Sequence, residues 1–170
     1  MSSFFLHLTS LFHIFLIPET LPAQLLIRMS WQPYIDNLKA PDESGNAPVE
    51  EAAICGLSSG AESVWCSTPA LANITVDEIK KLANDRKLFP ERGAFIAGKK
   101  CMMLRDNLDT EGVYTLDMKS AKDADGNAYG LCVGKSSTAL IIAQGKKDAT
   151  GGQLATRVYK MVEYLRKSNM

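Results

Sequence analysis

Apolar positions near residue 30 recur with helical spacing. Four of them fall at positions i, i+3, i+4 and i+7: Trp31, Tyr34, Ile35 and Leu38. This spacing predicts an amphipathic helix, and Ser30 stands where its N-cap is expected. A Gly-Gly pair near the other end of the chain precedes a second helical stripe, made of Leu154, Val158, Val162 and Leu165. The pattern therefore predicts a helix near each end of the folded region.

Short apolar runs separated by Gly, Asp and Asn turns occupy the middle of the chain and predict strands. They cover residues 52–57, 63–67, 93–108, 113–119, 128–135 and 138–145. One further helix is predicted over residues 76–84, where Thr75 is the N-cap, acidic residues fill the first turn and lysines follow. Consecutive strands between terminal helices predict a single α+β domain, with a central antiparallel β-sheet flanked by the N- and C-terminal helices.

Composition narrows the range of partners. The 170 residues carry 19 Lys and Arg against 19 Asp and Glu. No overall field draws the chain to nucleic acid, so nucleic acid is not expected as a partner, and a charged partner must be met by a local patch. The four cysteines lie far apart in apolar runs, with no CxxC pair: Cys55, Cys66, Cys101 and Cys132. This distribution favours reduced core thiols and predicts no metal site.

Residues 1–28 differ from the rest, because they are apolar and hold one basic residue, Arg28, at their far end. Three interpretations stay open: an upstream or alternative start without a fold of its own, a secretory signal, or a membrane-associating segment. The apolar run over residues 4–17 is short for a membrane span, so stable membrane insertion is not expected. On each interpretation we expect the folded domain to be residues 29–170.

Catalytic patterns are missing from that domain. Both histidines, His7 and His13, lie in the extension, which removes Ser-His-Asp and Cys-His arrangements from residues 29–170. The sequence also lacks the glycine-rich phosphate-binding motifs. We therefore expect a binding protein that is not an enzyme and needs no cofactor.

Six short stretches in order carry a family resemblance. They are WQPYIDNL at 31–38, EAAICG at 51–56, SVW at 63–65, NIT at 73–75, GKKCMMLRDNL at 98–108 and MVEYLRKSN at 161–169. Together they resemble profilin, in the order and spacing of its vertebrate members, across essentially all of residues 29–170. The resemblance implies a protein of the cytoplasm and cytoskeleton that regulates actin polymerisation. Its implied partners are the actin monomer, proline-rich proteins and phosphoinositide lipids.

Aromatic residues form the first candidate site. If the terminal helices lie side by side, their rings gather into one groove of the kind that grips polyproline II segments. The resemblance implies a polyproline-binding site at Trp31, Tyr34, Trp65, Tyr164 and Met170. The alternative is that Trp31 and Tyr34 are ordinary core residues.

The resemblance also implies an actin-binding surface, at Lys100, Arg105, Gly152, Thr156 and Lys160. Several positions depart from the family pattern; Lys160, for example, stands where many vertebrate members have a glutamate. These departures favour an alternative, a proline-rich-peptide adaptor of profilin fold with weakened actin binding. A small-molecule sensor or minor enzyme on a similar scaffold is a third hypothesis, disfavoured by the missing histidines and glycine-rich loops.

Basic residues form the last candidate site. A phosphoinositide-binding surface is implied at Lys100, Lys119, Arg166 and Lys167. The alternative is that these are ordinary solvated surface cations, which is the favoured interpretation for Lys119 because acidic residues flank it.

Overall fold

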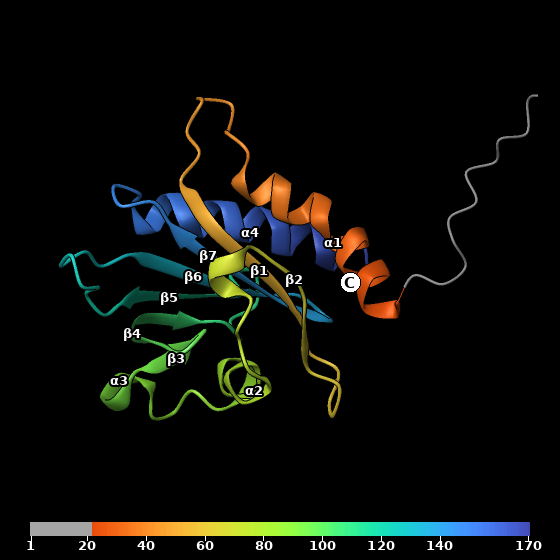
Figure 1. Ribbon diagram of the computed structural model, residues 1–170, viewed down its shortest axis with the longest axis horizontal. Helices are drawn as coiled ribbons and strands as arrows, with labels where there is room; N and C mark the ends of the chain where they lie inside the picture. The colour runs from red at the N-terminus through yellow and green to blue at the C-terminus, as the bar shows by residue number, and fades with distance from the viewer. Residues whose placement is uncertain (1–21) are drawn as a thin grey trace, which may run out of the picture.

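A computed structural model describes residues 22–170 of the chain (Figure 1). Most of the predicted apolar extension, residues 1–21, lies outside the described part. One antiparallel sheet of seven strands forms the centre, in the spatial order β2-β1-β7-β6-β5-β4-β3. The strands are β1 (Val49–Gly56), β2 (Ser63–Ser67), β3 (Ala94–Ile96), β4 (Lys99–Asn107), β5 (Thr115–Ser120), β6 (Gly130–Lys135) and β7 (Ala139–Gly145). The predicted α+β class is confirmed.

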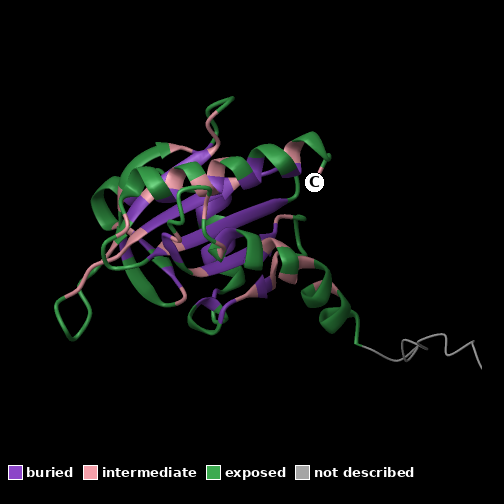
Figure 2. Ribbon diagram, turned by 90° about the horizontal axis from the view of Figure 1, so that it is seen from above, coloured by how far each residue is buried: buried purple, intermediate pink, exposed green. Residues whose placement is uncertain are grey.

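The two terminal helices cover one face of this sheet. Helix α1 (Ala23–Lys39) packs on β1 and β2, and α4 (Gly151–Lys167) packs on β5, β6 and β7 (Figure 1). The apolar stripe predicted for the last helix is fully buried at this contact, as are Ile35 and Leu38 of α1. Green, exposed residues line the outer sides of both helices in Figure 2, as expected for amphipathic helices on a sheet.

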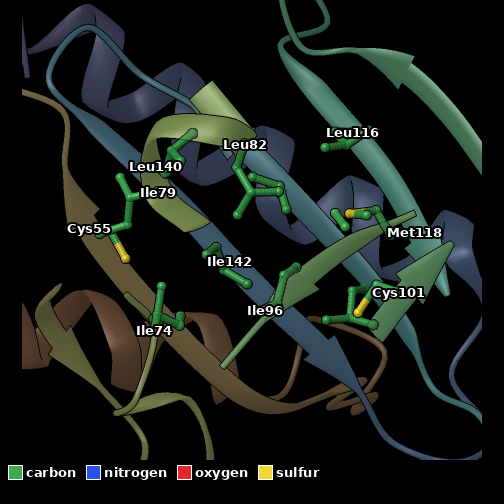
Figure 3. Close-up of a cluster of buried hydrophobic side chains, with 14 of the residues drawn as sticks. Cys55, Ile74, Ile79, Leu82, Ile96, Cys101, Leu116, Met118, Leu140 and Ile142 are labelled. Carbon is green, nitrogen blue, oxygen red and sulfur yellow. The ribbon is translucent and has the colours of Figure 1, made fainter. Parts of the chain in front are cut away.

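The opposite face carries a second core under α2 (Val76–Asn84) (Figure 3). Successive side chains of a strand point to opposite faces, so β7 supplies Ala139 and Ile141 to the first core and Leu140 and Ile142 to the second. A sheet buried on both faces explains the unbroken apolar runs at residues 52–55 of β1 and 139–143 of β7. Two short helices, η1 (Pro69–Leu71) and α3 (Phe89–Arg92), complete the structure.

Helix α4 approaches the sheet closely at β6. A Cβ atom on Gly134 would lie 2.5 Å from side-chain carbons of both Val158 and Val162. Only glycine leaves room for the helix at this depth.

The start of α1 differs from the prediction. The helix begins at Ala23, six residues before Met29, and Pro22 is its N-cap. Ser30 is therefore not the N-cap; it lies inside the helix, and its Oγ donates to the carbonyl of Ile27 at 2.8 Å. The pattern of buried positions begins only at Trp31, because the turns before it are almost entirely exposed. The first two turns of α1 therefore lack the helical spacing of buried residues on which the prediction relied.

The predicted strand over residues 93–108 is two strands joined by a tight turn. Ala97 and Gly98 both have positive φ, at 50° and 74°, which reverses the chain between β3 and β4. The carboxylate of Glu78 accepts hydrogen bonds from both turn amides, at 3.2 and 2.9 Å. The same carboxylate accepts from the Thr75 amide in the capping box of α2, so the predicted Thr75 cap is confirmed and also anchors this hairpin.

All four cysteines are free and buried, which confirms the prediction of reduced core thiols. Between residues 22 and 170, no helix has the length and apolar character needed to cross a membrane. In that same range, no group of three or more His, Cys, Asp and Glu residues is arranged to hold a metal ion.

Candidate functional site

Four aromatic rings gather where α1 meets β2 and α4, as the sequence predicted for side-by-side terminal helices. The indoles of Trp31 and Trp65 stack with ring centroids 5.0 Å apart and an interplanar angle of 27°. Trp31 contacts Tyr34 with centroids 4.9 Å apart, and Tyr34 contacts Tyr164 at 6.3 Å. We call this chain of rings the aromatic cluster. Its members come from three elements that only the folded sheet brings together.

Exposure within the aromatic cluster increases toward α4. Trp31, Tyr34 and Trp65 are half-buried, with their inner edges on the core between the helices and the sheet. Tyr164 is 57% exposed. Trp31 and Tyr34 are thus neither fully buried core residues nor fully exposed ones, since they pack against the core and also reach solvent.

Met170 packs against the same core as the aromatic cluster. It is half-buried on the same core, and its amide donates to the carbonyl of Leu165 at 2.8 Å. Its carbonyl accepts from the amide of Ser137 at 3.0 Å. The last residue is therefore held by the α4 backbone and by the turn between β6 and β7.

Trp65 lies directly over a glycine of the neighbouring strand. A Cβ atom on Gly56 would come within 2.4–2.5 Å of three atoms of the indole. The φ of Gly56 is not positive, so the glycine is required by the close approach of the ring and not by the backbone. The position of Trp65 in the aromatic cluster thus depends on a residue with no side chain.

A pocket of about 700 Å³ continues from the aromatic cluster between α1 and α4. Tyr34 and Tyr164 line it together with Ser30, Pro33, Asn37, Leu38, Arg157, Lys160 and Met161. One guanidinium nitrogen of Arg157 donates to the carbonyl of Asn37 at 3.2 Å and to that of Ala40. These bonds satisfy carbonyls at the C-terminus of α1 and tie the two helices together.

The candidate actin-binding residues on β4 lie on the sheet face that α4 covers only in part. Cys101 packs in the core under α2, so its neighbours Lys100 and Met102 point to the other face and are exposed. The guanidinium of Arg105 donates to Asp117 of β5 at 2.7 and 3.0 Å. The Asp117 side chain is only 14% exposed, so its carboxylate depends on Arg105 for a charged partner within the protein.

Exposed apolar side chains accompany these cations. Phe95 stands opposite Lys100 across the β3–β4 hairpin and is 53% exposed. Met102 and Leu104 are 42% and 65% exposed. The sequence analysis did not single out these three residues, because an apolar residue in a strand is usually assigned to the core.

The candidate actin-binding residues on α4 lie at two places along the helix. Gly152 and Thr156 are exposed in the first turns, where the Thr156 hydroxyl donates to the Gly152 carbonyl at 2.8 Å. Lys160 lies farther along, in the pocket between α1 and α4. Lys160 is therefore beside the aromatic cluster.

The basic residues of the predicted lipid site divide between two places. Lys100 lines a small pocket of about 280 Å³ together with Lys99 and Lys122, and Lys119 lies on the adjacent β5 strand. Arg166 stacks over the ring of Tyr114 at 3.4 Å, and Lys167 pairs with Glu163 at 3.2 Å. The last two cations are thus already engaged within the protein.

Comparison with known proteins identifies the family. The family model described as Profilin matches residues 29–170. The chain belongs to the profilin family. Human profilin-1 is 31% identical and human profilin-2 is 33% identical to it, each over 141 residues that cover 81% of this chain and 96% of the relative. A solved structure of mouse profilin IIa in complex with a double repeat from the FH1 domain of mDia1 is 34% identical, with a TM-score of 0.74, over 82% of this chain and 99% of that one.

Two features of this profilin's candidate site have no signal in the sequence alone. Gly56 ends a strand and resembles any turn glycine until Trp65 is seen above it. Arg157 appears as one more surface cation of α4, whereas its guanidinium meets carbonyls of α1 more than a hundred residues earlier. Each role depends on a contact between elements distant in the chain.

Proposed function

We propose that this profilin binds proline-rich segments at the aromatic cluster. The observation that carries the proposal is the unbroken chain of rings, Trp31 to Trp65 and Trp31 through Tyr34 to Tyr164, with centroid separations of 4.9–6.3 Å. Polyproline II helices arrive already ordered and stack their pyrrolidine faces on such rings. The similarity to mouse profilin IIa, whose solved structure is a complex with an FH1 double repeat, supports this assignment.

Titration with a proline decamer tests this proposal directly. Two of the rings are indoles, so binding is expected to change tryptophan fluorescence as the peptide covers Trp31 and Trp65. A peptide of the same length made of alternating Gly and Ser is the control, because it lacks both the polyproline II bias and the pyrrolidine faces. Equal responses to the two peptides would contradict the proposal.

We also propose that the exposed face of β4 binds monomeric actin. Family membership supports the assignment, and the patch has a suitable chemistry: the apolar Phe95, Met102 and Leu104 surround Lys100. Aromatic and methionine side chains are enriched at protein interfaces and bury apolar area on contact. Gly152 and Thr156 of α4 are assigned to the edge of the same interface.

Actin assembly in the presence of increasing protein separates this function from the alternative, a proline-peptide adaptor with weakened actin binding. Sequestration of monomers is expected to slow assembly in proportion to the protein added. Lys160 lies beside the aromatic cluster, which leaves fewer residues of α4 to contact actin. This position favours the adaptor alternative. Normal peptide binding without any effect on actin assembly would select the adaptor.

We propose phosphoinositide binding at the cations of β4 and β5, where Lys99, Lys100 and Lys122 line one pocket and Lys119 lies nearby. Clustered lysines attract anionic headgroups by about 1 kcal/mol each near a membrane surface. Co-sedimentation with vesicles that contain or lack a phosphoinositide is the test. Lys100→Gln is expected to weaken the association, and Lys167→Gln, which removes a cation already paired with Glu163, is the matched control.

A further inference from the structure

The pocket between α1 and α4 extends the aromatic cluster in one direction. The contacts Tyr34–Tyr164 and Asn37–Arg157 show that the two helices run antiparallel, because position increases along α1 as it decreases along α4. Beyond the two tyrosines the lining continues toward the C-terminus of α1 and the start of α4, where Asn37 and Arg157 lie, while Ser30 and Pro33 line the pocket on the preceding turn of α1. A ligand that lies across the rings reaches this pocket at one of its ends.

The charge of the pocket is of one sign. Its lining includes the cations Arg157 and Lys160 and no carboxylate. Neither cation forms an ion pair with any residue in the described range 22–170. Arg157 bonds only neutral carbonyls, and its Nε is buried without a hydrogen-bond partner. The positive charge of this pocket is thus not neutralised by an ion pair.

Acidic residues on the surrounding elements are engaged elsewhere. Asp36 of α1 accepts a hydrogen bond from Gln32 at 2.9 Å, and Glu163 of α4 pairs with Lys167. Asp42, in the loop after α1, accepts from the Ser44 hydroxyl at 2.6 Å and from two backbone amides. These hydrogen bonds lower the pKa of Asp42, and the bond from the Ser44 hydroxyl has the largest effect. The positive charge of Arg157 lowers the pKa further.

We propose that this basic pocket binds an acidic side chain that flanks the proline run of the partner, and so selects among proline-rich segments. The inference rests on the proposed function of the aromatic cluster. The prolines stack on the rings, while an Asp or Glu beyond them meets the Lys160 ammonium in the field of Arg157. The pocket thereby selects one orientation of the bound peptide, which the repeated prolines alone do not specify.

The spacing can be estimated from helix geometry. Lys160 and Arg157 precede Tyr164 by four and seven residues on α4, which corresponds to roughly 6 and 10 Å along the helix axis. A polyproline II segment advances about 3.1 Å per residue, so the acidic residue belongs about two to three positions beyond the proline that contacts Tyr164. An acid at the opposite end of the run does not reach the pocket.

Three decaproline peptides test the proposal: one unmodified, one with two aspartates added after a single spacer residue at the N-terminal end, and one with the same addition at the C-terminal end. Dissociation constants are measured with the full chain by tryptophan fluorescence at low and at 0.5 M salt. One acidic peptide is expected to bind about two- to fivefold more tightly than decaproline, the range for an exposed ion pair. Screening is expected to remove most of that preference at high salt.

Charge reversal assigns the effect to its residue. Lys160→Glu is expected to turn the preference into discrimination against the same acidic peptide, measured as the ratio of its dissociation constant to that of decaproline for the same variant. Lys87→Glu, at an exposed position remote from the pocket, makes the same change in net charge and is expected to keep the preference. Equal binding of all three peptides, or a preference that survives Lys160→Glu, overturns this proposal alone. If none of the peptides binds, the proposed function fails with it.

Discussion

The indoles of Trp31 and Trp65 stack 5.0 Å apart although one lies on the first helix and the other on the edge strand β2. The pair joins α1 to the sheet, and at the same time it forms half of the proposed peptide-binding surface. Binding and stability are therefore coupled at these residues. A useful variant must remove a contact with the ligand while leaving the stacking intact.

Tyr34→Phe meets that condition. The substitution removes a hydroxyl that has no hydrogen-bond partner within the described residues and leaves the ring in contact with Trp31 and Tyr164. We expect weaker decaproline binding, by the roughly 0.5–1.5 kcal/mol of one hydrogen bond, with little change in melting temperature. Fluorescence titration and thermal unfolding of the same samples would measure both. Unchanged affinity would show that the hydroxyl does not contact the peptide.

Trp31→Ala is expected to affect both properties. Loss of a central ring should reduce decaproline affinity by about 2 kcal/mol or more, roughly thirtyfold in dissociation constant. Because the indole is only half-buried, the free energy of unfolding should fall by less than the roughly 3–5 kcal/mol typical of a buried tryptophan. Urea unfolding provides that value. A larger loss of stability would assign Trp31 to the core.

Gly56→Ala tests the aromatic cluster without altering any of its members. The new methyl group would overlap the Trp65 indole, which must then move away from Trp31. We expect decaproline affinity to fall severalfold, together with a change in the emission of the displaced indole. Gly152→Ala, a glycine with open space around its Cβ position, is the control. Full affinity in Gly56→Ala would show that binding tolerates a displaced Trp65.

The sequence predicted the elements whose signals are local, and it missed the features that need a second element. Helical periodicity placed α4 and the buried part of α1, and the Thr75 N-cap with the charge order of the following residues placed α2, because each pattern lies within one segment. The split of residues 93–108 into two strands escaped prediction, because the Ala97–Gly98 turn is held partly by Glu78 of α2. The aromatic residues could be named in advance, whereas the basic pocket could not, because it exists only where α1 and α4 meet.

Arg105 and Lys100 are expected to behave differently when reversed in charge. Lys100 is exposed without an ion pair among residues 22–170, so Lys100→Glu should reduce actin sequestration and leave stability unchanged. Arg105→Glu sets a carboxylate beside Asp117 and should also cost about 1–2 kcal/mol of unfolding free energy. Actin assembly and urea unfolding would be compared for both variants. Loss of decaproline binding in Lys100→Glu would indicate that the two surfaces overlap.

The buried thiols predict a loss of stability in alkali. Burial raises the pKa of Cys55 to about 12 and that of Cys101 to about 11, from 9.0 in the unfolded chain. The unfolded chain therefore releases these protons first, and the stability they contribute is complete below pH 9 and declines as pH rises toward 11–12. At pH 10 each thiol should account for a loss of about 1.4 kcal/mol. Urea unfolding under reducing conditions at pH 8, 9 and 10 measures this trend. Cys55→Ala should have a shallower slope; an equal slope would contradict the assignment.

The first two turns of α1 should be dispensable for the fold. Pro33 lies inside the helix and has no amide hydrogen to donate to the Met29 carbonyl, so the helix on either side of this point is weakly coupled. Residues 23–28 are exposed except for the half-buried Ile27. Their side-chain interactions with the sheet are a 3.4 Å contact from Gln24 to the Val64 carbonyl and the approach of Arg28 to Cys66 of β2. In a chain that starts at Met29, Pro33 falls in the first turn, where a missing amide costs nothing, and Ser30 becomes free to act as the N-cap.

We therefore expect the chain from Met29 to unfold within a few degrees of the full chain and to bind decaproline with the same affinity, because Trp31 and every later contact of the aromatic cluster are retained. Differential scanning calorimetry and peptide titration would compare chains starting at residues 1, 22 and 29. The chain from residue 22 is the informative control, since it keeps both exposed turns and lacks everything before them. A large fall in melting temperature between starts 22 and 29 would place the Gln24 turn in the folded domain. A fall between starts 1 and 22 would instead assign a stabilising contact to the apolar segment before it.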